Sequence, residues 1–178
     1  IVTEISGTTR DAIDVPFEVE TNGVCQRYNL IDTAGIRKRR RIRDEVEFFS
    51  VNRSEKAIER CDLAVLVMDA AEGITEQDKK ICDRITEVGC ACVIVVNKWD
   101  LFRMALEKAR KKEAEKSAMQ GGRKFSRKKQ EELMYDEFGK WVKANLFFID
   151  YAPVIFTSAI EGFQLDRLLE AIRYVTSQ

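Results

Sequence analysis

The segment DLAVLVMD, residues 62–69, indicates the type of fold because it is almost continuously apolar. Two later runs, ACVIVV at 91–96 and PVIF at 153–156, repeat the pattern. Short apolar runs without polar alternation are typical of strands that are covered on both faces, as in a parallel sheet. We therefore expect these segments to be strands of one buried, mostly parallel sheet.

Amphipathic helical patterns separate and follow these strands. Thr75, with Asp78 three residues later, has the spacing of a capping box, and apolar residues at helical spacing follow it. Further apolar stripes at 138–146 and 165–175 predict two more helices. Buried strands that alternate with amphipathic helices define an α/β fold. Such sheets bind ligands at the carboxyl ends of their strands, so the loops that follow the strands are the places to look for chemistry.

A different pattern precedes the buried strands. Residues 14–21 and 24–32 are rich in β-forming residues, and Asn22-Gly23 lies between them. Asn-Gly between two such runs is the strongest short-range signal for a hairpin. We expect an antiparallel β-hairpin here.

Composition and charge exclude several classes of protein. The 178 residues are 45% hydrophobic, which suits one domain with a substantial core. Thirty Lys and Arg balance thirty Asp and Glu, so no net field favours nucleic acid or membrane. The apolar runs are too short to span a bilayer. With no His and five Cys of unpaired spacing, a zinc site, a His-based triad and a disulfide framework are not expected, and we expect a cytoplasmic protein.

Short motifs follow three predicted strands at the edge where ligands bind. DTAG follows strand 24–32, NKWD follows strand 91–96, and TSA follows strand 153–156. The carboxylate of DTAG can hold Mg²⁺ through water, and its glycine lets a backbone N–H approach a terminal phosphate. Asp100 can accept two hydrogen bonds from the N1 and N2 edge of guanine, and a backbone N–H of TSA can reach guanine O6. Each motif alone occurs by chance, but their order and common placement predict a guanine-nucleotide site.

The chain resembles the Era- and TrmE-type GTPases, and most closely the second GTPase domain of the Der (EngA) family of double-Era-like proteins. The stretches that carry the resemblance are EISGTTRDAIDVPFE, YNLIDTAGIRKR, KAIERCDLAVLVMDAAEGITEQD, VIVVNKWDL and DYAPVIFTSAIEG. The resemblance implies a P-loop NTPase fold of the Ras-like G-domain type, with three layers and a mostly parallel sheet. It also implies that the intact protein is a GTPase that binds GTP or GDP with Mg²⁺.

The resemblance assigns roles to individual residues. Thr9 would ligate Mg²⁺ from switch I, and Asp32 would contact the metal from switch II. The switch II residues near the γ-phosphate would be Asp32, Thr33, Ala34, Gly35 and Ile36. The guanine pocket would be formed by Asn97, Lys98, Trp99, Asp100, Ser158 and Ala159. Ile36 stands where Ras-like proteins place a catalytic glutamine, and its aliphatic side chain cannot orient water, so the family implies a K⁺ ion beside the phosphates. Thr9, Gly35 and Ile36 are the catalytic candidates.

One family motif is missing from the chain. The phosphate loop GxxxxGK[ST] does not occur, and the only Gly-Lys pair, Gly139-Lys140, lies in a helical pattern. In the family, the loop and its strand precede the segment with which this chain begins. We expect residues 1–178 to be a single G domain that lacks its first strand and phosphate loop and is inactive by itself, with flanking domains in the parent protein. A natural GTPase without phosphate-binding function is the alternative.

Two basic segments are candidate contacts for RNA. Residues 36–43 hold six basic residues in eight, and residues 103–132 hold eleven Lys or Arg against five Asp or Glu. Clustered basic residues attract phosphates, although solvated loops and spacers have the same composition. The longer segment reads as an insertion into the domain.

Together with these motifs, the resemblance to the Der family implies the GTP-hydrolysing domain of a ribosome-biogenesis GTPase that acts in large-subunit maturation and contacts ribosomal RNA. Two alternatives remain open. One is a transfer-RNA-modification GTPase of the TrmE type, which shares GTTRD and DTAGIR, whereas GITEQD and DYAP favour the Der type. The other is a non-hydrolysing scaffold that uses only its basic surface, and release of phosphate from GTP would separate it from a GTPase.

Overall fold

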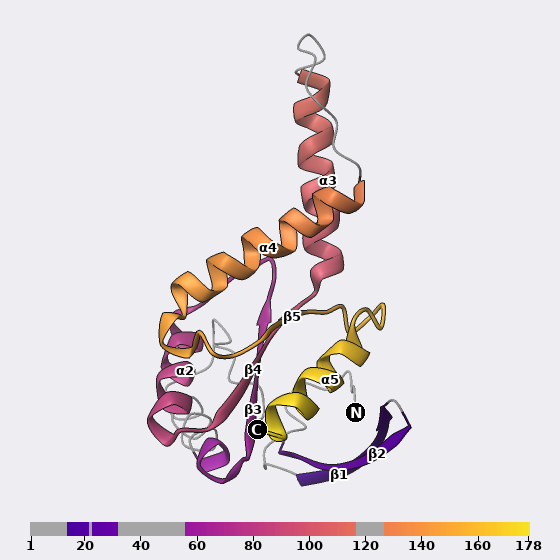
Figure 1. The fold of residues 1–178 in the computed structure, drawn as a ribbon. Coiled ribbons are helices and arrows are strands. Elements are labelled where there is room, and N and C mark those ends of the chain that lie inside the picture. Colours follow the sequence, from indigo (N-terminus) through magenta and orange to yellow (C-terminus); the bar gives the residue numbers. More distant parts are fainter. Residues whose placement is uncertain (1–13, 22, 32–55, 117–126) are drawn as a thin grey trace, which may run out of the picture.

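The computed structural model describes residues 14–21, 23–31, 56–116 and 127–178 of the chain (Figure 1). Residues 56–60 are helical. The other elements, in chain order, are β1 (Asp14–Thr21), β2 (Val24–Ile31), β3 (Leu63–Asp69), α2 (Glu76–Val88), β4 (Ala91–Asn97), α3 (Trp99–Lys116), α4 (Arg127–Asn145), the 3₁₀ turn η1 (Phe147–Ile149), β5 (Val154–Phe156) and α5 (Leu165–Thr176).

The three apolar runs form one parallel sheet, as predicted. β4 lies between β3 and β5. Residues 92–96 of β4 are all buried, because neighbouring strands and packed helices surround this central strand. The register pairs Asp69 with Asn97 and Val96 with Phe156, so the carboxyl ends of all three strands meet at the same edge.

Helices cover both faces of this sheet. On one face, Leu66 and Ile94 pack in a single buried cluster with Ile85 of α2 and Val142 of α4. Val93 alternates with these positions along β4 and so points to the opposite face, where α5 contacts β4 and β3. The three layers confirm the predicted α/β G-domain architecture. Within the described ranges, no helix combines the length and the apolar character needed to cross a membrane.

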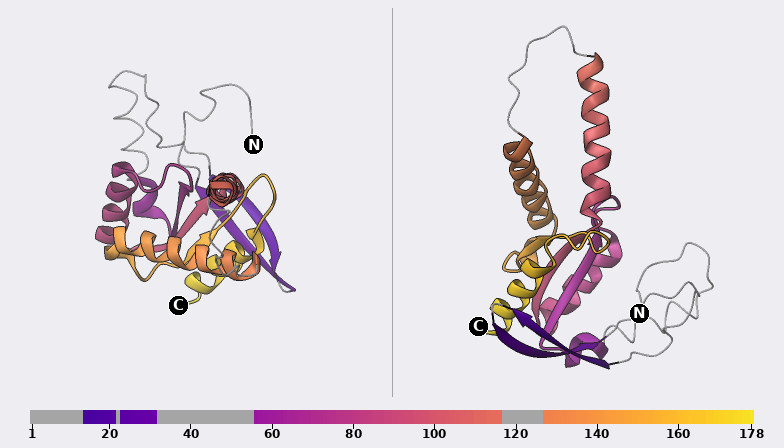
Figure 2. Two further views of the ribbon diagram at one scale, coloured as in Figure 1. Left: turned by 90° about the horizontal axis from the view of Figure 1, so that it is seen from above. Right: turned by 90° about the vertical axis from the view of Figure 1, so that its right-hand side faces the viewer.

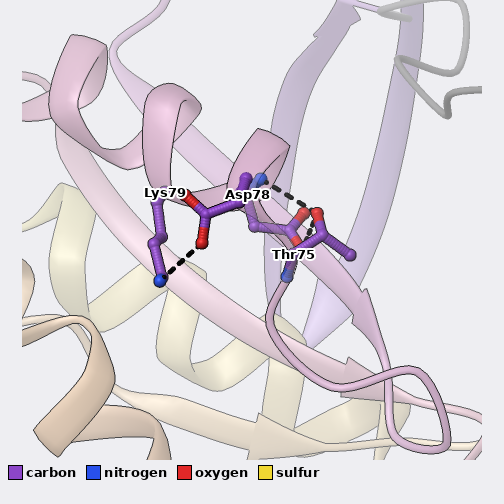
Figure 3. A network of polar contacts seen from close by, with 4 residues as sticks. Thr75, Asp78 and Lys79 are labelled. Carbon is purple, nitrogen blue, oxygen red and sulfur yellow. Dashed lines mark hydrogen bonds and ion pairs between the residues drawn. The ribbon is translucent and has the colours of Figure 1, made fainter.

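The capping box predicted at the start of α2 is present (Figure 3). The Asp78 backbone N–H donates to Thr75 Oγ1 at 3.2 Å, and the Thr75 backbone N–H donates to Asp78 Oδ2 at 2.8 Å. Glu76 pairs with Lys79 at 2.8 Å, and the hydrogen bond from the ammonium lowers the pKa of the carboxyl. The two bonds between Thr75 and Asp78 satisfy backbone donors that the start of the helix would otherwise leave unpaired.

Helices occupy the described ends of the predicted basic insertion. α3 begins within the NKWD motif and projects away from the sheet, as Figure 1 and the right view of Figure 2 show. α4 contains the predicted apolar stripe and packs against β5 and η1. The last two residues of the NKWD motif, Trp99 and Asp100, are therefore the first two residues of the projecting helix.

The Asn-Gly hairpin predicted before the sheet is also present. β1 and β2 pair antiparallel with Thr21 opposite Val24, and Gly23 has the positive φ of 76° that such tight turns need. The hairpin forms a sheet of its own and lies beside α5 (Figure 1). Leu30 of β2 and Val67 of β3 are each 56% exposed. The described residues thus leave apolar surface uncovered on both sheets.

Candidate functional site

Three loops meet at the carboxyl edge of the parallel sheet. Asp69 ends β3, Asn97 ends β4, and Thr157 follows β5. The Ala70 N–H donates to the Asn97 carbonyl at 2.9 Å, and the Trp99 N–H donates to the Thr157 carbonyl at 3.0 Å. These backbone bonds join the start of the NKWD loop to the segments on both sides of it.

The side chain of Asn97 links the NKWD and TSA motifs. Its Oδ1 accepts a hydrogen bond from Thr157 Oγ1 at 3.2 Å and another from the Ala159 backbone N–H at 3.1 Å. Thr157 and Ser158 are buried, whereas Ala159 is exposed. Ser158 Oγ accepts from the Glu161 N–H at 3.2 Å, which closes the turn after the motif. Asn97 and Ser158 therefore hold the TSA loop in place and leave Ala159 at the surface.

Lys98 forms an ion pair with the residue that ends β3. Its Nζ lies 2.7 Å from Asp69 Oδ2, and Asp69 Oδ1 accepts the Ala71 N–H at 2.9 Å. The Asp69 side chain is 5% exposed and the Lys98 side chain 43%. Lys98 has a φ of +61°, a left-handed conformation that is uncommon outside glycine, asparagine and aspartate. Strained backbone of this kind gathers at functional sites.

Asp100 lies in the first turn of α3 and is half-buried. The N–H groups of Leu101 and Phe102 donate to the Lys98 carbonyl at 3.1 and 3.4 Å, which anchors the helix start to the NKWD loop. A carboxylate in the first turn interacts favourably with the helix dipole.

Trp99 lies in the core rather than at the surface of the site. Its side chain is 1% exposed and stacks on Phe102 and Tyr135, with ring centroids 4.9 and 5.3 Å apart. It also contacts Phe138 and Phe156. Burial raises the pKa of the Tyr135 phenol. Any contact between Trp99 and a ligand is therefore restricted to the backbone, and its side chain fixes the loop by packing.

Half of the predicted site lies outside the described residues. This holds for the Mg²⁺ and phosphate candidates and for the potassium-linked position, namely Thr9, Asp32, Thr33, Ala34, Gly35 and Ile36. In the part of the chain that the structure describes, no group of three or more Cys, Asp or Glu side chains could hold a metal ion. The described half is the one for which the sequence predicts base binding, formed by the NKWD and TSA loops.

Sequence reasoning missed two features of this edge, namely the role of Asp69 and the contact between Thr157 and Asn97. In the sequence, Asp69 is only a charged residue at the end of an apolar run. Its ion pair with Lys98 becomes apparent only once the register between β3 and β4 is known. Thr157 was recognised as part of TSA, but its bond to Asn97 was not predicted. A polar residue at the carboxyl end of an apolar strand is the signal that could have found both.

Comparison with known proteins defines the class to which this chain belongs. Residues 5–178 match the family model described as the elongation factor Tu GTP binding domain. The chain is therefore a member of that family of GTP-binding domains. Its fold is also similar to that of Era in the crystal structure of Era in complex with MgGDPNP and nucleotides 1506–1542 of 16S ribosomal RNA. The TM-score is 0.60 at 20% sequence identity, and the match covers 98% of this chain and 47% of the Era chain. A probable GTP-binding protein engB has a TM-score of 0.57 at 18% identity, with 92% and 84% covered.

Within the family, the chain is similar to proteins named GTPase Der. It is 42% identical over 177 residues to the protein from Synechococcus sp. (strain JA-2-3B'a(2-13)), and 42% identical over 178 residues to that from Alkaliphilus oremlandii (strain OhILAs). The alignments cover 99% and 100% of this chain but 32% and 34% of those relatives, so the chain spans about a third of their length. The resemblance to a Der-type GTPase domain that the sequence predicted is confirmed.

Proposed function

We propose that this chain is the guanine-nucleotide-binding and GTP-hydrolysing domain of a ribosome-assembly GTPase that acts in maturation of the large subunit. The observation that carries the proposal is the double hydrogen bond to Asn97 Oδ1, which joins the NKWD loop to the TSA loop. Two loops held at fixed spacing can present polar groups to both edges of one planar base. The family match over residues 5–178 supports GTP as the nucleotide.

Base recognition follows from the chemistry of the groups at this edge. Guanine offers N1–H and N2–H donors side by side, and the Asp100 carboxylate accepts two such bonds. The Ala159 N–H, which donates to Asn97 Oδ1, would be shared with guanine O6 when the base is bound. Adenine has an amino group where guanine has O6, and it has no N1–H. The site would therefore discriminate against adenine nucleotides through unpaired polar groups.

Hydrolysis would depend on the switch residues outside the described ranges. Thr9 and Asp32 would hold Mg²⁺, and Gly35 would bring a backbone N–H to the γ-phosphate. Ile36 cannot hydrogen-bond to the attacking water, which fits a K⁺-dependent site. These ions would supply positive charge for the developing negative charge on the phosphate oxygens. The 178 residues contain no GxxxxGK[ST] motif, so the chain alone would be inactive.

Ribosomal RNA is the proposed partner, and the basic segments 36–43 and 103–132 are the proposed contacts. A structural neighbour, Era, binds a 16S ribosomal RNA segment, which supports RNA as the class of partner. Clustered Lys and Arg gain affinity for phosphates by releasing counterions. The proposed site of action is the cytoplasm.

The proposal is tested by nucleotide binding and turnover in the full-length gene product. We expect GTP and GDP to bind at least a hundredfold more tightly than ATP, and phosphate to be released from GTP. Nucleotide binding without phosphate release would favour the non-hydrolysing scaffold. Equal affinity for GTP and ATP would overturn the assignment of the site to guanine.

A further inference from the structure

The ion pair between Lys98 and Asp69 has features of a device that positions a ligand-binding residue. Asp69 belongs to neither the NKWD nor the TSA motif, yet its carboxylate is nearly buried and lies 2.7 Å from the Lys98 ammonium. We infer that Asp69 is a positioning residue of the guanine site, which acts through Lys98 by holding that side chain in its binding conformation. This inference rests on the proposed function of the site.

The two carboxylate oxygens of Asp69 have separate partners. Oδ1 accepts the Ala71 N–H at 2.9 Å and so belongs to the loop that follows β3. Oδ2 receives the Lys98 ammonium. A buried carboxylate is stable only when charges and hydrogen bonds compensate it. The Asp69 carboxylate therefore attracts the Lys98 ammonium strongly. An isosteric amide at position 69 can keep the hydrogen bond from the Ala71 N–H while it loses the attraction for Lys98.

Lys98 is held at both of its ends. Its backbone has the strained φ of +61°, and the neighbouring Trp99 N–H is fixed to the Thr157 carbonyl at 3.0 Å. Its ammonium is fixed by Asp69, while 43% of the side chain remains exposed. When both ends of a lysine are fixed, its methylene stem forms an apolar surface, and its ammonium already has a partner. Such a surface beside Asp100 can receive one face of a flat base.

Fixing this side chain before the ligand arrives lowers the cost of binding. A free lysine samples many rotamers, and ordering it on binding weakens affinity. Removal of the Asp69 charge should therefore weaken nucleotide binding without removing any group that touches the nucleotide. If one long side chain must become ordered when the ligand binds, affinity falls about three- to tenfold.

The test is a double-mutant cycle in the full-length gene product. Affinity and dissociation rate are measured with a fluorescent GDP analogue for wild type, Asp69→Asn, Lys98→Met and the double variant. Asp69→Asn keeps an oxygen for the Ala71 N–H and removes the ion pair. Glu76→Gln is the matched control. It removes the exposed ion pair between Glu76 and Lys79, whose charged atoms are 2.8 Å apart and which is not part of the site. Unfolding temperatures of all variants are recorded alongside.

We expect Asp69→Asn to weaken binding about three- to tenfold in the wild-type background, through faster dissociation, and to cause no further loss when Lys98 is already Met. Glu76→Gln should bind as wild type does. An unchanged affinity of Asp69→Asn, or the same loss in both backgrounds, would overturn the inference. If wild type itself does not bind the GDP analogue, the proposed function fails, which is a separate result.

Discussion

The backbone N–H of Ala159 donates a hydrogen bond of 3.1 Å to Oδ1 of Asn97, a residue 62 positions earlier in the chain. Thr157 Oγ1 donates to the same oxygen at 3.2 Å. One side-chain atom at the end of β4 thus holds the loop that follows β5. Because the two loops carry the base-recognition groups that we propose, this bond sets the distance between the two edges of the site.

Replacement of Asn97 by alanine should loosen both loops. The exposed Ala159 N–H and the buried Thr157 hydroxyl would both lose their acceptor, and leaving the buried hydroxyl unpaired costs about 1–3 kcal/mol. We expect GTP affinity to fall at least tenfold and the free energy of unfolding to decrease. Thr157→Val is the matched variant, since it removes only one of the two bonds, and it should cost about 1 kcal/mol with a smaller loss of affinity. Calorimetry and denaturant unfolding measure both quantities, and tight GTP binding by Asn97→Ala would contradict the bridging role.

Asp100→Asn should change the base preference of the site. An amide can donate to the C2 carbonyl of xanthine, whereas it matches the N1–H and N2–H pair of guanine poorly. Loss of a two-point, charge-assisted contact costs on the order of 2–5 kcal/mol. We expect weaker GTP binding and improved XTP binding in the full-length gene product, measured by calorimetry. Undiminished GTP affinity would remove Asp100 from the site.

Hydrolysis should respond to the kind of monovalent cation. Because Ile36 cannot hydrogen-bond to water, we expect phosphate release to be faster in potassium than in sodium at equal ionic strength. Ile36→Ala should leave the rate within about tenfold, whereas loss of a catalytic acid or base costs roughly 10²–10⁴. Phosphate release is followed in both salts with the full-length gene product, and equal rates would eliminate the potassium-dependent mechanism.

The isolated 178-residue polypeptide should bind GTP weakly. It keeps the loops that we propose for base recognition but contains no GxxxxGK[ST] motif to surround the phosphates. Exposed apolar side chains such as Leu30 and Val67, each 56% exposed, should also make it prone to association. We expect a dissociation constant no tighter than roughly millimolar, or about −4 kcal/mol, by isothermal titration. Micromolar binding would mean that another part of this chain holds the phosphates.

The capping box of α2 should contribute to stability but not to nucleotide affinity. Thr75→Ala removes the acceptor of the Asp78 N–H and should lower the free energy of unfolding by about 0.5–2 kcal/mol. Asp78→Ala removes the acceptor of the Thr75 N–H and should act similarly. Denaturant unfolding measures the loss, and Glu76→Gln, which touches only an exposed ion pair, is the control. A change in GTP affinity with either capping variant would link α2 to the site, contrary to our expectation.

Much of the secondary structure could be predicted from local patterns. The strand of residues 92–96 is apolar at every position and is buried at every position. Thr75 and Asp78 form the box that their spacing predicts, and Gly23 has the positive φ of the predicted turn. The projecting helix α3 could not be predicted with the same ease from the sequence. Its charged sequence lacks the apolar stripe of a helix that buries one face. Trp99 was assigned to the site by its place in NKWD, but its indole packs in the core.

Local sequence patterns are enough to predict the α/β class, the hairpin, the start of α2 and the order of the motifs, because periodicity, turn chemistry and capping act over a few neighbouring residues. Which motif residues touch one another depends instead on the fold of the whole domain. Asn97 and Thr157 lie 60 residues apart, and Asp69 ends β3 whereas Lys98 follows β4. Their contacts depend on the register in which β3, β4 and β5 pair, and that register is set by packing of side chains from the whole domain, which no short stretch of sequence contains.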